Sequence, residues 1–282
     1  MGQLCFIIER NCRTLIIPVN GTMANLLDGK SIVIIGGTSG IGLAASKSFI
    51  REGAKVLALG APDGPQPSLG KNGFVLLADA RQEGVAEHAI DRCIQLFGGF
   101  DGLYHVAGGS GRKKGDGALH ELTLEGWNYT MELNLTSLML SNQAAIRQFL
   151  KQKKGGAILN TGSVLSSHPS AEFFATHAYA ASKAAIVGLS KASSAAYADK
   201  NIRINVIAPG LTDTPMAARA KKDKAIQRFI RSKQPLNGGR MAKPEDLNGM
   251  AGFLFSDAAQ FITGQVIQVD GGWSVSEGGK SK

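Results

Sequence analysis

The 282-residue sequence predicts a single domain of the α/β class, built on a doubly wound, seven-stranded parallel sheet. Two observations carry this prediction. Short apolar runs bounded by turn residues alternate along the chain with longer segments of helical period, and this alternation demands right-handed crossovers between parallel strands. The chain length and its 44% hydrophobic content are also enough to bury one large core.

The expected strands are seven apolar runs, each bounded by turn residues. They are Ser31–Ile35, Lys55–Leu59, Phe74–Ala78, Gly102–Val106, Gly156–Thr161, Arg203–Ala208 and Gln265–Val269. The expected helices lie between them, at about 40–52, 81–97, 124–153, 177–200 and 244–256. The segment Ala61–Gly73 holds three prolines and three glycines, so we expect an exposed loop there.

Two segments fall outside this alternation. Residues 1–22 are expected to be an N-terminal extension outside the core, because Met23 is followed by a polar lead into the first strand; the domain then spans 23–282. Residues 211–234 are expected to form an irregular insertion with seven basic side chains. This insertion follows the C-terminal end of a strand, where it is positioned to act as a lid over a ligand crevice.

Composition excludes several classes of protein. The cysteines Cys5, Cys12 and Cys93 are odd in number and form no cluster, so we expect neither a disulfide framework nor a metal site, and a cytoplasmic location. No apolar run reaches the roughly 20 residues that span a bilayer, so no membrane partner is expected. The net charge of +9 favours anionic partners. No nucleic-acid recognition motif accompanies that charge, so nucleic acid is not expected among them.

A glycine-rich loop follows the first strand. Its sequence is Gly36-Gly37-Thr38-Ser39-Gly40-Ile41-Gly42. Its first, third and fourth glycines permit a tight turn, close backbone approach to a pyrophosphate, and close packing of helix on strand. The following helix offers free N–H groups to phosphates. An ordinary turn explains such glycines equally well in isolation, but the strand before and the helix after favour a dinucleotide site.

The end of the second strand leaves the choice between NAD and NADP open. In dinucleotide folds an acidic residue there binds the ribose 2′-hydroxyl, or a basic residue binds the 2′-phosphate. This chain instead has Gly60 and Ala61, with Asp63 as a further acidic candidate in the loop. Because neither Ser39 nor Ala61 is basic, the sequence leans slightly to NAD.

Asp79 follows the third strand and has two interpretations. Its carboxylate is placed to accept a hydrogen bond from the adenine amino group. Its spacing from Gln82 is also that of a helix cap with a capping box. Both roles are compatible, since each carboxylate oxygen accepts separately.

A tyrosine and a lysine lie four residues apart in a predicted helix. The spacing of Tyr179-Ala180-Ala181-Ser182-Lys183 puts the phenol and the ammonium on one helix face. An ammonium near a phenol stabilises the phenolate and lowers a pKa that is ordinarily about 10. Such a shift suits a general acid/base that works near neutral pH. A solvated surface pair is the alternative for an arbitrary helix.

Together these motifs resemble the short-chain dehydrogenase/reductase (SDR) family over residues 26–273. The matching pieces are Gly36–Gly42, Ala107-Gly108, Asn134, Ser163, Tyr179-x-x-x-Lys183 and Pro209-Gly210, in this order. The resemblance implies a Rossmann fold, a homotetramer or homodimer, and a small-molecule carbonyl or alcohol substrate. It also implies an oxidoreductase that acts on CH–OH donors by transferring a hydride to or from NAD or NADP.

The resemblance also implies roles for individual residues. Tyr179 passes a proton to the carbonyl oxygen, Ser163 hydrogen-bonds that oxygen, and Lys183 lowers the pKa of the tyrosine and holds the nicotinamide ribose. Asn134 anchors a water in the proton relay, although a buried helix Asn also satisfies backbone groups. The expected cofactor-binding residues are Gly36, Thr38, Ser39, Gly40, Ile41, Gly42, Asp79, Ala80, Ala107, Gly108, Tyr179, Lys183, Pro209, Gly210, Thr212 and Thr214.

The match departs from the family pattern at several supporting positions. His105-Val106 stands where two asparagines are usual, and we expect His105 to hold the loop by a ring N–H bond rather than to reach the cofactor. The stretch between Ser163 and Tyr179 is about three residues longer than usual. Its aromatic side chains, Phe173 among them, either line a substrate pocket or cap the core.

These departures keep a second class of function in view, a non-catalytic NAD(P)-binding regulator or scaffold on the same fold. The basic clusters, 112–114 and 221–233, are expected to be solvated charged faces. A narrower hypothesis is that they attract an anionic substrate or an acyl-carrier protein, by analogy with 3-oxoacyl reductases of the family.

Overall fold

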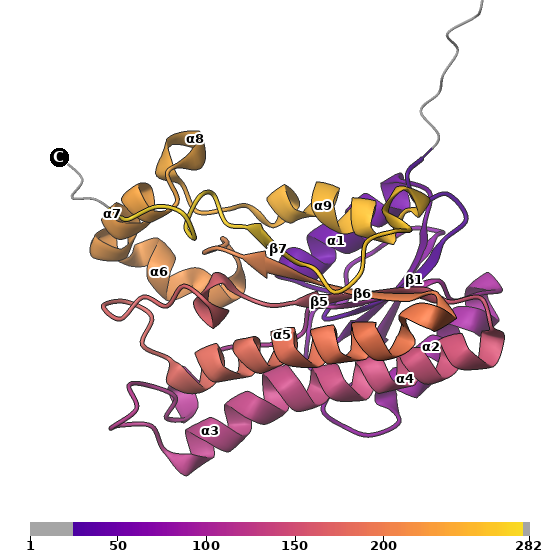
Figure 1. Ribbon diagram of the computed structural model, residues 1–282, viewed down its shortest axis with the longest axis horizontal. Helices are drawn as coiled ribbons and strands as arrows, with labels where there is room; N and C mark the ends of the chain where they lie inside the picture. The colour runs from indigo at the N-terminus through magenta and orange to yellow at the C-terminus, as the bar shows by residue number, and fades with distance from the viewer. Residues whose placement is uncertain (1–24, 279–282) are drawn as a thin grey trace, which may run out of the picture.

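A parallel seven-stranded sheet forms the centre of the computed structural model, which describes residues 25–278 (Figure 1). The expected extension 1–22 lies outside the described residues. The strand order β3-β2-β1-β4-β5-β6-β7 confirms the doubly wound prediction. The strands are β1 (Ser31–Ile35), β2 (Lys55–Gly60), β3 (Gly73–Leu77), β4 (Gly102–His105), β5 (Gly156–Thr161), β6 (Ile202–Pro209) and β7 (Val266–Val269).

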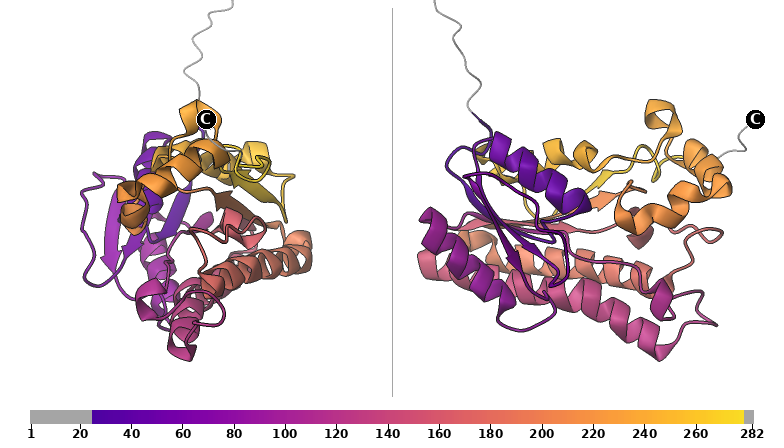
Figure 2. Two further views of the ribbon diagram at one scale, coloured as in Figure 1. Left: turned by 90° about the vertical axis from the view of Figure 1, so that its left-hand side faces the viewer. Right: turned by 180° about the vertical axis from the view of Figure 1, so that it is seen from behind.

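Helices cover both faces of the sheet (Figures 1 and 2). One face carries α1 (Gly40–Arg51) and α9 (Asn248–Phe255), and the other carries α2 (Val85–Phe97), α4 (Ser137–Gln152) and α5 (His177–Tyr197). Each face has its own apolar core, because neighbouring residues of a buried strand point to opposite sides. No helix among residues 25–278 is both long and apolar enough to span a membrane.

The second predicted helix begins later than expected, and its predicted cap is wrong. α2 starts at Val85, preceded by Gly84 in the left-handed conformation. Asp79 does not cap it, because the Asp79 carboxylate instead accepts the Arg81 backbone N–H at 3.0 Å and pairs with the Arg81 guanidinium at 2.7 Å. Because the Asp79 carboxylate is bonded to Arg81, it is not available to cap the N–H groups of α2.

The long helix predicted for 124–153 is interrupted. α3 (Leu124–Met131) passes through a π-helical turn at Glu132–Thr136 into α4. Asn134 lies in this turn and is fully buried. Single π-turns occur often at functional sites, and hydrophobic period alone does not predict them.

The prediction that 211–234 is irregular is also wrong. The segment contains α6 (Ala218–Lys222) and α7 (Lys224–Lys233), and α8 (Leu236–Gly239) follows it. Asp223 caps α7 by accepting the backbone N–H groups of Ala225 and Ile226. Ile226 and Ile230, spaced four apart, are buried on the inner face of α7 although the segment carries seven basic side chains.

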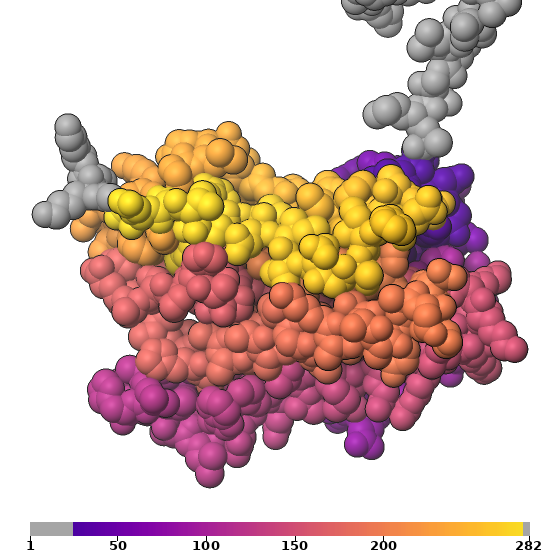
Figure 3. Space-filling view, viewed as in Figure 1, coloured from indigo at the N-terminus to yellow at the C-terminus, as the bar shows by residue number. Residues whose placement is uncertain are grey.

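The segment between β5 and α5 packs against α7 and the C-terminal segment (Figure 3). Phe173 and Phe174 contact Phe229, with ring centroids 5.2 and 6.4 Å apart, and Trp273 completes the group. The Trp273 indole N–H donates to the His168 carbonyl. The aromatic residues of this segment therefore cap a small separate core, the second of the two alternatives left open by the sequence.

Candidate active site

The site lies where the strand order reverses, between β1 and β4. The loops after these two strands touch: a β-carbon on Gly36 would lie 2.6 Å from the Ala107 backbone nitrogen. Gly36 has φ +85°, which a side chain would also disfavour. In doubly wound folds this crevice at the carboxyl ends of the strands is where ligands bind.

The backbone of the glycine loop packs tightly against itself and against the segment after β6. A β-carbon on Gly42 would clash with the Gly36 carbonyl oxygen, and one on Gly40 would contact the Thr214 methyl group at 3.3 Å. The loop after β1 and the segment after β6 therefore face each other, and each holds a predicted cofactor-binding residue, Gly40 and Thr214. Thr38 turns away and packs against Gly60, so its side chain is buried rather than presented to a ligand.

Four other predicted cofactor residues lie beside the crevice, near the carboxyl ends of β1 and β6. Ser39 precedes α1 without capping it, and Ile41 packs into the core between α1 and the sheet. The Thr212 hydroxyl donates to the Gly210 carbonyl. Pro209 ends β6. Contributions of these four residues to cofactor binding through the backbone stay predictions.

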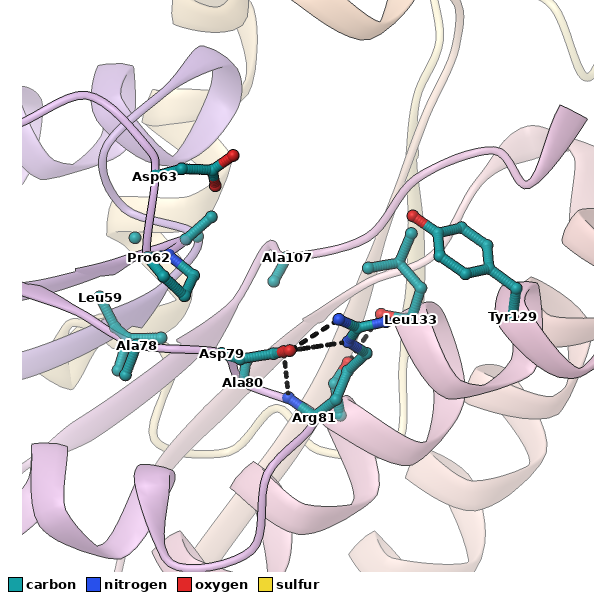
Figure 4. Close-up of a pocket in the computed structure, with 14 residues that line it drawn as sticks. Leu59, Pro62, Asp63, Ala78, Asp79, Ala80, Arg81, Ala107, Tyr129 and Leu133 are labelled. Carbon is teal, nitrogen blue, oxygen red and sulfur yellow. Dashed lines mark hydrogen bonds and ion pairs between the residues drawn. The ribbon is translucent and has the colours of Figure 1, made fainter. Parts of the chain in front are cut away.

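A cavity of about 290 Å³ opens beside the glycine loop (Figure 4). Predicted residues Gly36, Asp79, Ala80 and Ala107 line it, and so does Asp63. The other lining residues are Leu59, Gly60, Ala61, Pro62, Ala78, Arg81, Tyr129, Leu133 and Ser137. The cavity thus joins the ends of four neighbouring strands, β1 to β4, to the side chains of α3 and of the π-helical turn that follows it.

Arg81 and Tyr129 were not predicted from the sequence. Arg81 binds Asp79 with three side-chain hydrogen bonds and lies 5.9 Å from the Tyr129 ring centroid. The Arg81 guanidinium lowers the pKa of Asp79, mainly through these hydrogen bonds. The spacing of two residues between Asp79 and Arg81 could have predicted their ion pair. Tyr129 lies in a helix far along the chain, and nothing in the sequence indicates that it reaches the cavity.

Tyr179, Ser163 and Lys183 meet at the carboxyl end of β5. The Lys183 nitrogen lies 5.7 Å from the Tyr179 ring centroid. Burial raises the pKa of Tyr179, and the neighbouring Ser163 hydroxyl acts in the opposite direction. The pKa of Tyr179 is therefore raised rather than lowered as predicted, because desolvation of the phenolate dominates.

Lys183 is held by the end of the strand. Its ammonium donates to the Thr161 carbonyl at 2.8 Å and is only 3% exposed. Burial lowers the pKa of Lys183 to about 8. A β-carbon on Gly108 would lie 3.4 Å from this nitrogen, so Lys183 faces the loop after β4, where the expected cofactor-binding pair Ala107-Gly108 lies.

Asn134 clamps that same loop. Its side-chain oxygen accepts the Gly109 N–H, and its amide donates to the carbonyls of Gly109 and Thr130. The side chain thus satisfies buried backbone groups, which is the alternative that the sequence left open. Its role in anchoring a relay water stays a prediction.

His105 is a structural residue that ties β4 to α4. Its Nδ1 lies 2.8 Å from the Ser141 hydroxyl and its Nε2 lies 3.5 Å from that of Ser137. Burial lowers the pKa of His105 to about 3, so the ring is neutral near pH 7. As expected, the ring is used for a supporting bond, although its partner is a helix rather than the loop.

Residues 36–274 match the family model described as enoyl-(acyl carrier protein) reductase. The chain is 35% identical to 2,5-dichloro-2,5-cyclohexadiene-1,4-diol dehydrogenase of Sphingobium indicum, covering 90% of this chain and 99% of that protein. It is 33% identical to cis-4-hydroxycyclohexanecarboxylate dehydrogenase of Sinomonas cyclohexanicum, covering 86% and 95%. The chain belongs to the short-chain dehydrogenase/reductase family. As an SDR protein it is an oxidoreductase, and dehydrogenases of this family generally use NAD(P).

Solved SDR structures agree with the fold. A short-chain type dehydrogenase/reductase from Mycobacterium ulcerans superposes with a TM-score of 0.79 at 27% identity, covering 89% of this chain and 91% of that one. The Rossmann-like sheet predicted from the sequence is therefore confirmed by the strand order and by this similarity.

Proposed function

We propose that this SDR protein interconverts a secondary alcohol and a carbonyl compound with NAD(P), using Tyr179 as the general acid/base. The observation that carries the proposal is the convergence of three side chains: the Tyr179 phenol, the Ser163 hydroxyl beside it and the Lys183 ammonium 5.7 Å from the phenol ring centroid. A phenol, a neutral donor and a cation at one strand end can hold a substrate oxygen and exchange its proton.

The protein groups divide the work by their chemistry. In reduction, Tyr179 donates its proton to the carbonyl oxygen while Ser163 donates a hydrogen bond to the same oxygen; in oxidation, Tyr179 accepts the proton of the alcohol. The ammonium of Lys183, 5.7 Å from the Tyr179 ring centroid, would offset the negative charge left on the phenolate. Asn134 fixes the Gly109 backbone beside this group.

The residues present fit a nicotinamide dinucleotide. The glycine loop leaves backbone in place of side chains at the crevice, and the cavity next to it has room for an adenosine. Residues 36–42 would hold the pyrophosphate, Asp79 and Ala80 the adenine, Ala107 and Gly108 the central part, and Lys183 the nicotinamide ribose. When bound, the cofactor supplies or accepts the hydride.

NAD is the cofactor that the charges favour. Asp63 lines the cavity near the position where a 2′-phosphate would lie, and its carboxylate would repel that phosphate. Arg81, the basic residue among the lining residues, is paired with Asp79. The proposal is therefore a preference for NAD over NADP, which steady-state rates with each cofactor test directly.

A cyclic secondary alcohol is the proposed substrate class. Both dehydrogenases named above act, by their names, on hydroxyl groups of six-membered rings. The test is a panel of cyclohexanols and cyclohexanones assayed with NAD(H) by nicotinamide absorbance, with linear alcohols of equal carbon number as the comparison. Higher kcat/KM for the cyclic members supports the class, and equal values contradict it.

Tyr179→Phe tests the chemistry itself. A general acid contributes roughly 10²–10⁴-fold, so kcat should fall by that range while NADH binding, followed by fluorescence, stays within twofold. An unchanged kcat would sink the assignment of Tyr179. NADH binding with no turnover of the panel by the unaltered protein would instead favour the non-catalytic regulator.

Assembly and location complete the proposal. We expect a homotetramer or homodimer in the cytoplasm, as the family resemblance and the cysteine content indicate. Light scattering on the purified protein measures the mass of the particle against the 29.6 kDa chain. A particle of one chain mass contradicts the oligomer.

A further inference from the structure

The helix that carries Tyr179 begins without a cap of its own. The side chain of Thr176, at the N-cap position of α5, caps no helix N–H, and its hydroxyl points to the Phe174 carbonyl instead. A helix leaves its first N–H groups without intrahelical partners, and buried ones must find acceptors elsewhere. Here the first intrahelical bond is donated by Ala180, to the Thr176 carbonyl.

A segment some 60 residues away supplies the missing acceptors. The Asp116 carboxylate accepts the N–H of Ala178 at 3.0 Å and that of Tyr179 at 3.1 Å, one through each oxygen. The Gly117 carbonyl accepts the N–H of His177 at 3.1 Å. All three unpartnered N–H groups of the first turn are thereby satisfied by two adjacent residues of the loop after β4.

Asp116 is itself held in one place. It is 2% exposed, and its N–H donates to the Gly111 carbonyl. A β-carbon on Gly126 of α3 would lie 2.5 Å from the Asp116 nitrogen, so the loop rests directly on that helix. Burial raises the pKa of Asp116, while the two N–H groups and the charge of Arg112 favour its ionised form.

We propose that Asp116 is a positioning residue for the SDR reaction: through two charge-assisted hydrogen bonds it fixes the first turn of α5 and so the Tyr179 phenol. The inference rests on the proposed role of Tyr179. It goes beyond that role because the carboxylate bonds the backbone nitrogen of the catalytic residue rather than any ligand. Misplacement of a reacting group by about 1 Å costs on the order of 100-fold in rate.

The first test compares two carboxylates. Asp116→Ala should lower kcat by about 10- to 100-fold with NADH affinity within twofold. Asp116→Asn keeps one acceptor oxygen but places an amide NH2 against the other backbone N–H, so it should recover only part of that loss. Asp101→Ala is the matched control: it also removes a carboxylate that accepts a backbone N–H, from Ser31, but at the opposite edge of the sheet. It should lower the melting temperature and leave kcat per folded molecule unchanged.

The second test separates positioning from general stability. If Asp116 acts through the phenol, adding Asp116→Ala to Tyr179→Phe should lower the residual activity by less than twofold, far less than in the unaltered background. Full additivity, or equal loss of kcat in Asp101→Ala, overturns the proposal. An unchanged rate in Tyr179→Phe alone would instead defeat the proposed function, so the two failures are distinguishable.

Discussion

Asp63 lies at the rim of the adenosine-sized cavity, where one charge can decide between two cofactors. Asp63→Asn should raise kcat/KM for NADPH about fivefold, because about 1 kcal/mol of repulsion at an exposed site is removed, and should leave kcat/KM for NADH nearly unchanged. Steady-state kinetics with both cofactors measures this. Glu83→Gln, an exposed acid outside the cavity lining, is the control. A parallel change for both cofactors would refute the role.

Lys183 is a residue whose burial opposes folding. The unfolded chain keeps this proton up to a pH of about 10.4 and the folded one up to about 8, so the unfolded state binds more protons between these values. Stability contributed by this group is therefore lowest below pH 8 and rises up to about pH 10.4.

Lys183→Met should accordingly raise the free energy of unfolding at pH 7 by on the order of 2 kcal/mol, and with it the melting temperature by a few degrees. Activity should be lost. The gain should shrink by pH 10, where the lysine of the unaltered protein is neutral in the fold. Thermal unfolding at the two pH values checks both parts. A variant that melts lower than the unaltered protein at pH 7 would contradict this account.

At the scale of single residues, the sequence predicted which side chains meet at the candidate site but not which hydrogen bonds they make. Tyr179, Ser163 and Lys183 were predictable because a fixed spacing and the ends of strands place them. The role of Asp116 was not predictable, since an aspartate beside a glycine in a loop is common. The two N–H groups that its carboxylate accepts lie 62 and 63 residues away in the sequence. The pKa of Tyr179 was misjudged because burial cannot be read from a spacing.

Two helix glycines, Gly42 and Gly188, should respond in opposite ways to replacement by alanine. Gly42→Ala in α1 would press a methyl group on the Gly36 carbonyl, so we expect destabilisation of about 1–3 kcal/mol and a loss of NADH affinity above about tenfold. Gly188→Ala in α5 meets open space and should stabilise by about 0.5–1 kcal/mol. Thermal unfolding and NADH fluorescence of the pair decide this; similar effects of both changes would contradict it.

Element boundaries were the weaker part of the sequence-based prediction. Strands were placed within one or two residues because buried parallel strands are continuous apolar runs. Residues 211–234 were predicted to be irregular because of their many lysines and arginines. Three apolar residues at helical spacing, Ile226, Phe229 and Ile230, instead pack one side of α7. The late start of α2 depends on the Asp79–Arg81 pair, which competes with the cap.

Net charge is a property of the whole molecule, and it bears on the substrate. Arg112 lies in the segment after β4 and Arg219 in α6, yet burial and the charge of Arg219 lower the pKa of Arg112. With +9 overall, the KM of any cyclohexanol of the panel that carries a carboxylate should rise severalfold between low and high salt at saturating NAD. The neutral carboxamide of the same alcohol is the control. A salt-independent KM for the carboxylate would exclude electrostatic attraction.

The whole sheet was predictable because alternation of strand and helix leaves few topologies. Parallel strands, right-handed crossovers and short connections fix the order once seven strands are counted. What the sequence could not supply was the meeting of distant segments, such as the contact of Phe173 with Phe229. Those contacts depend on side-chain shape across loops, for which no periodic signal exists.

The small core between residues 211–234 and the β5–α5 connection bears on how related proteins can diverge. Val164, Ile226, Ile230 and Trp273 bury one another apart from the two cores that flank the sheet. This core is built from α6, α7, the C-terminal segment and the β5–α5 connection, so it can change as a unit while the strands of the sheet stay in place. Loops and short helices on one scaffold can therefore diverge between related proteins without disturbing the sheet.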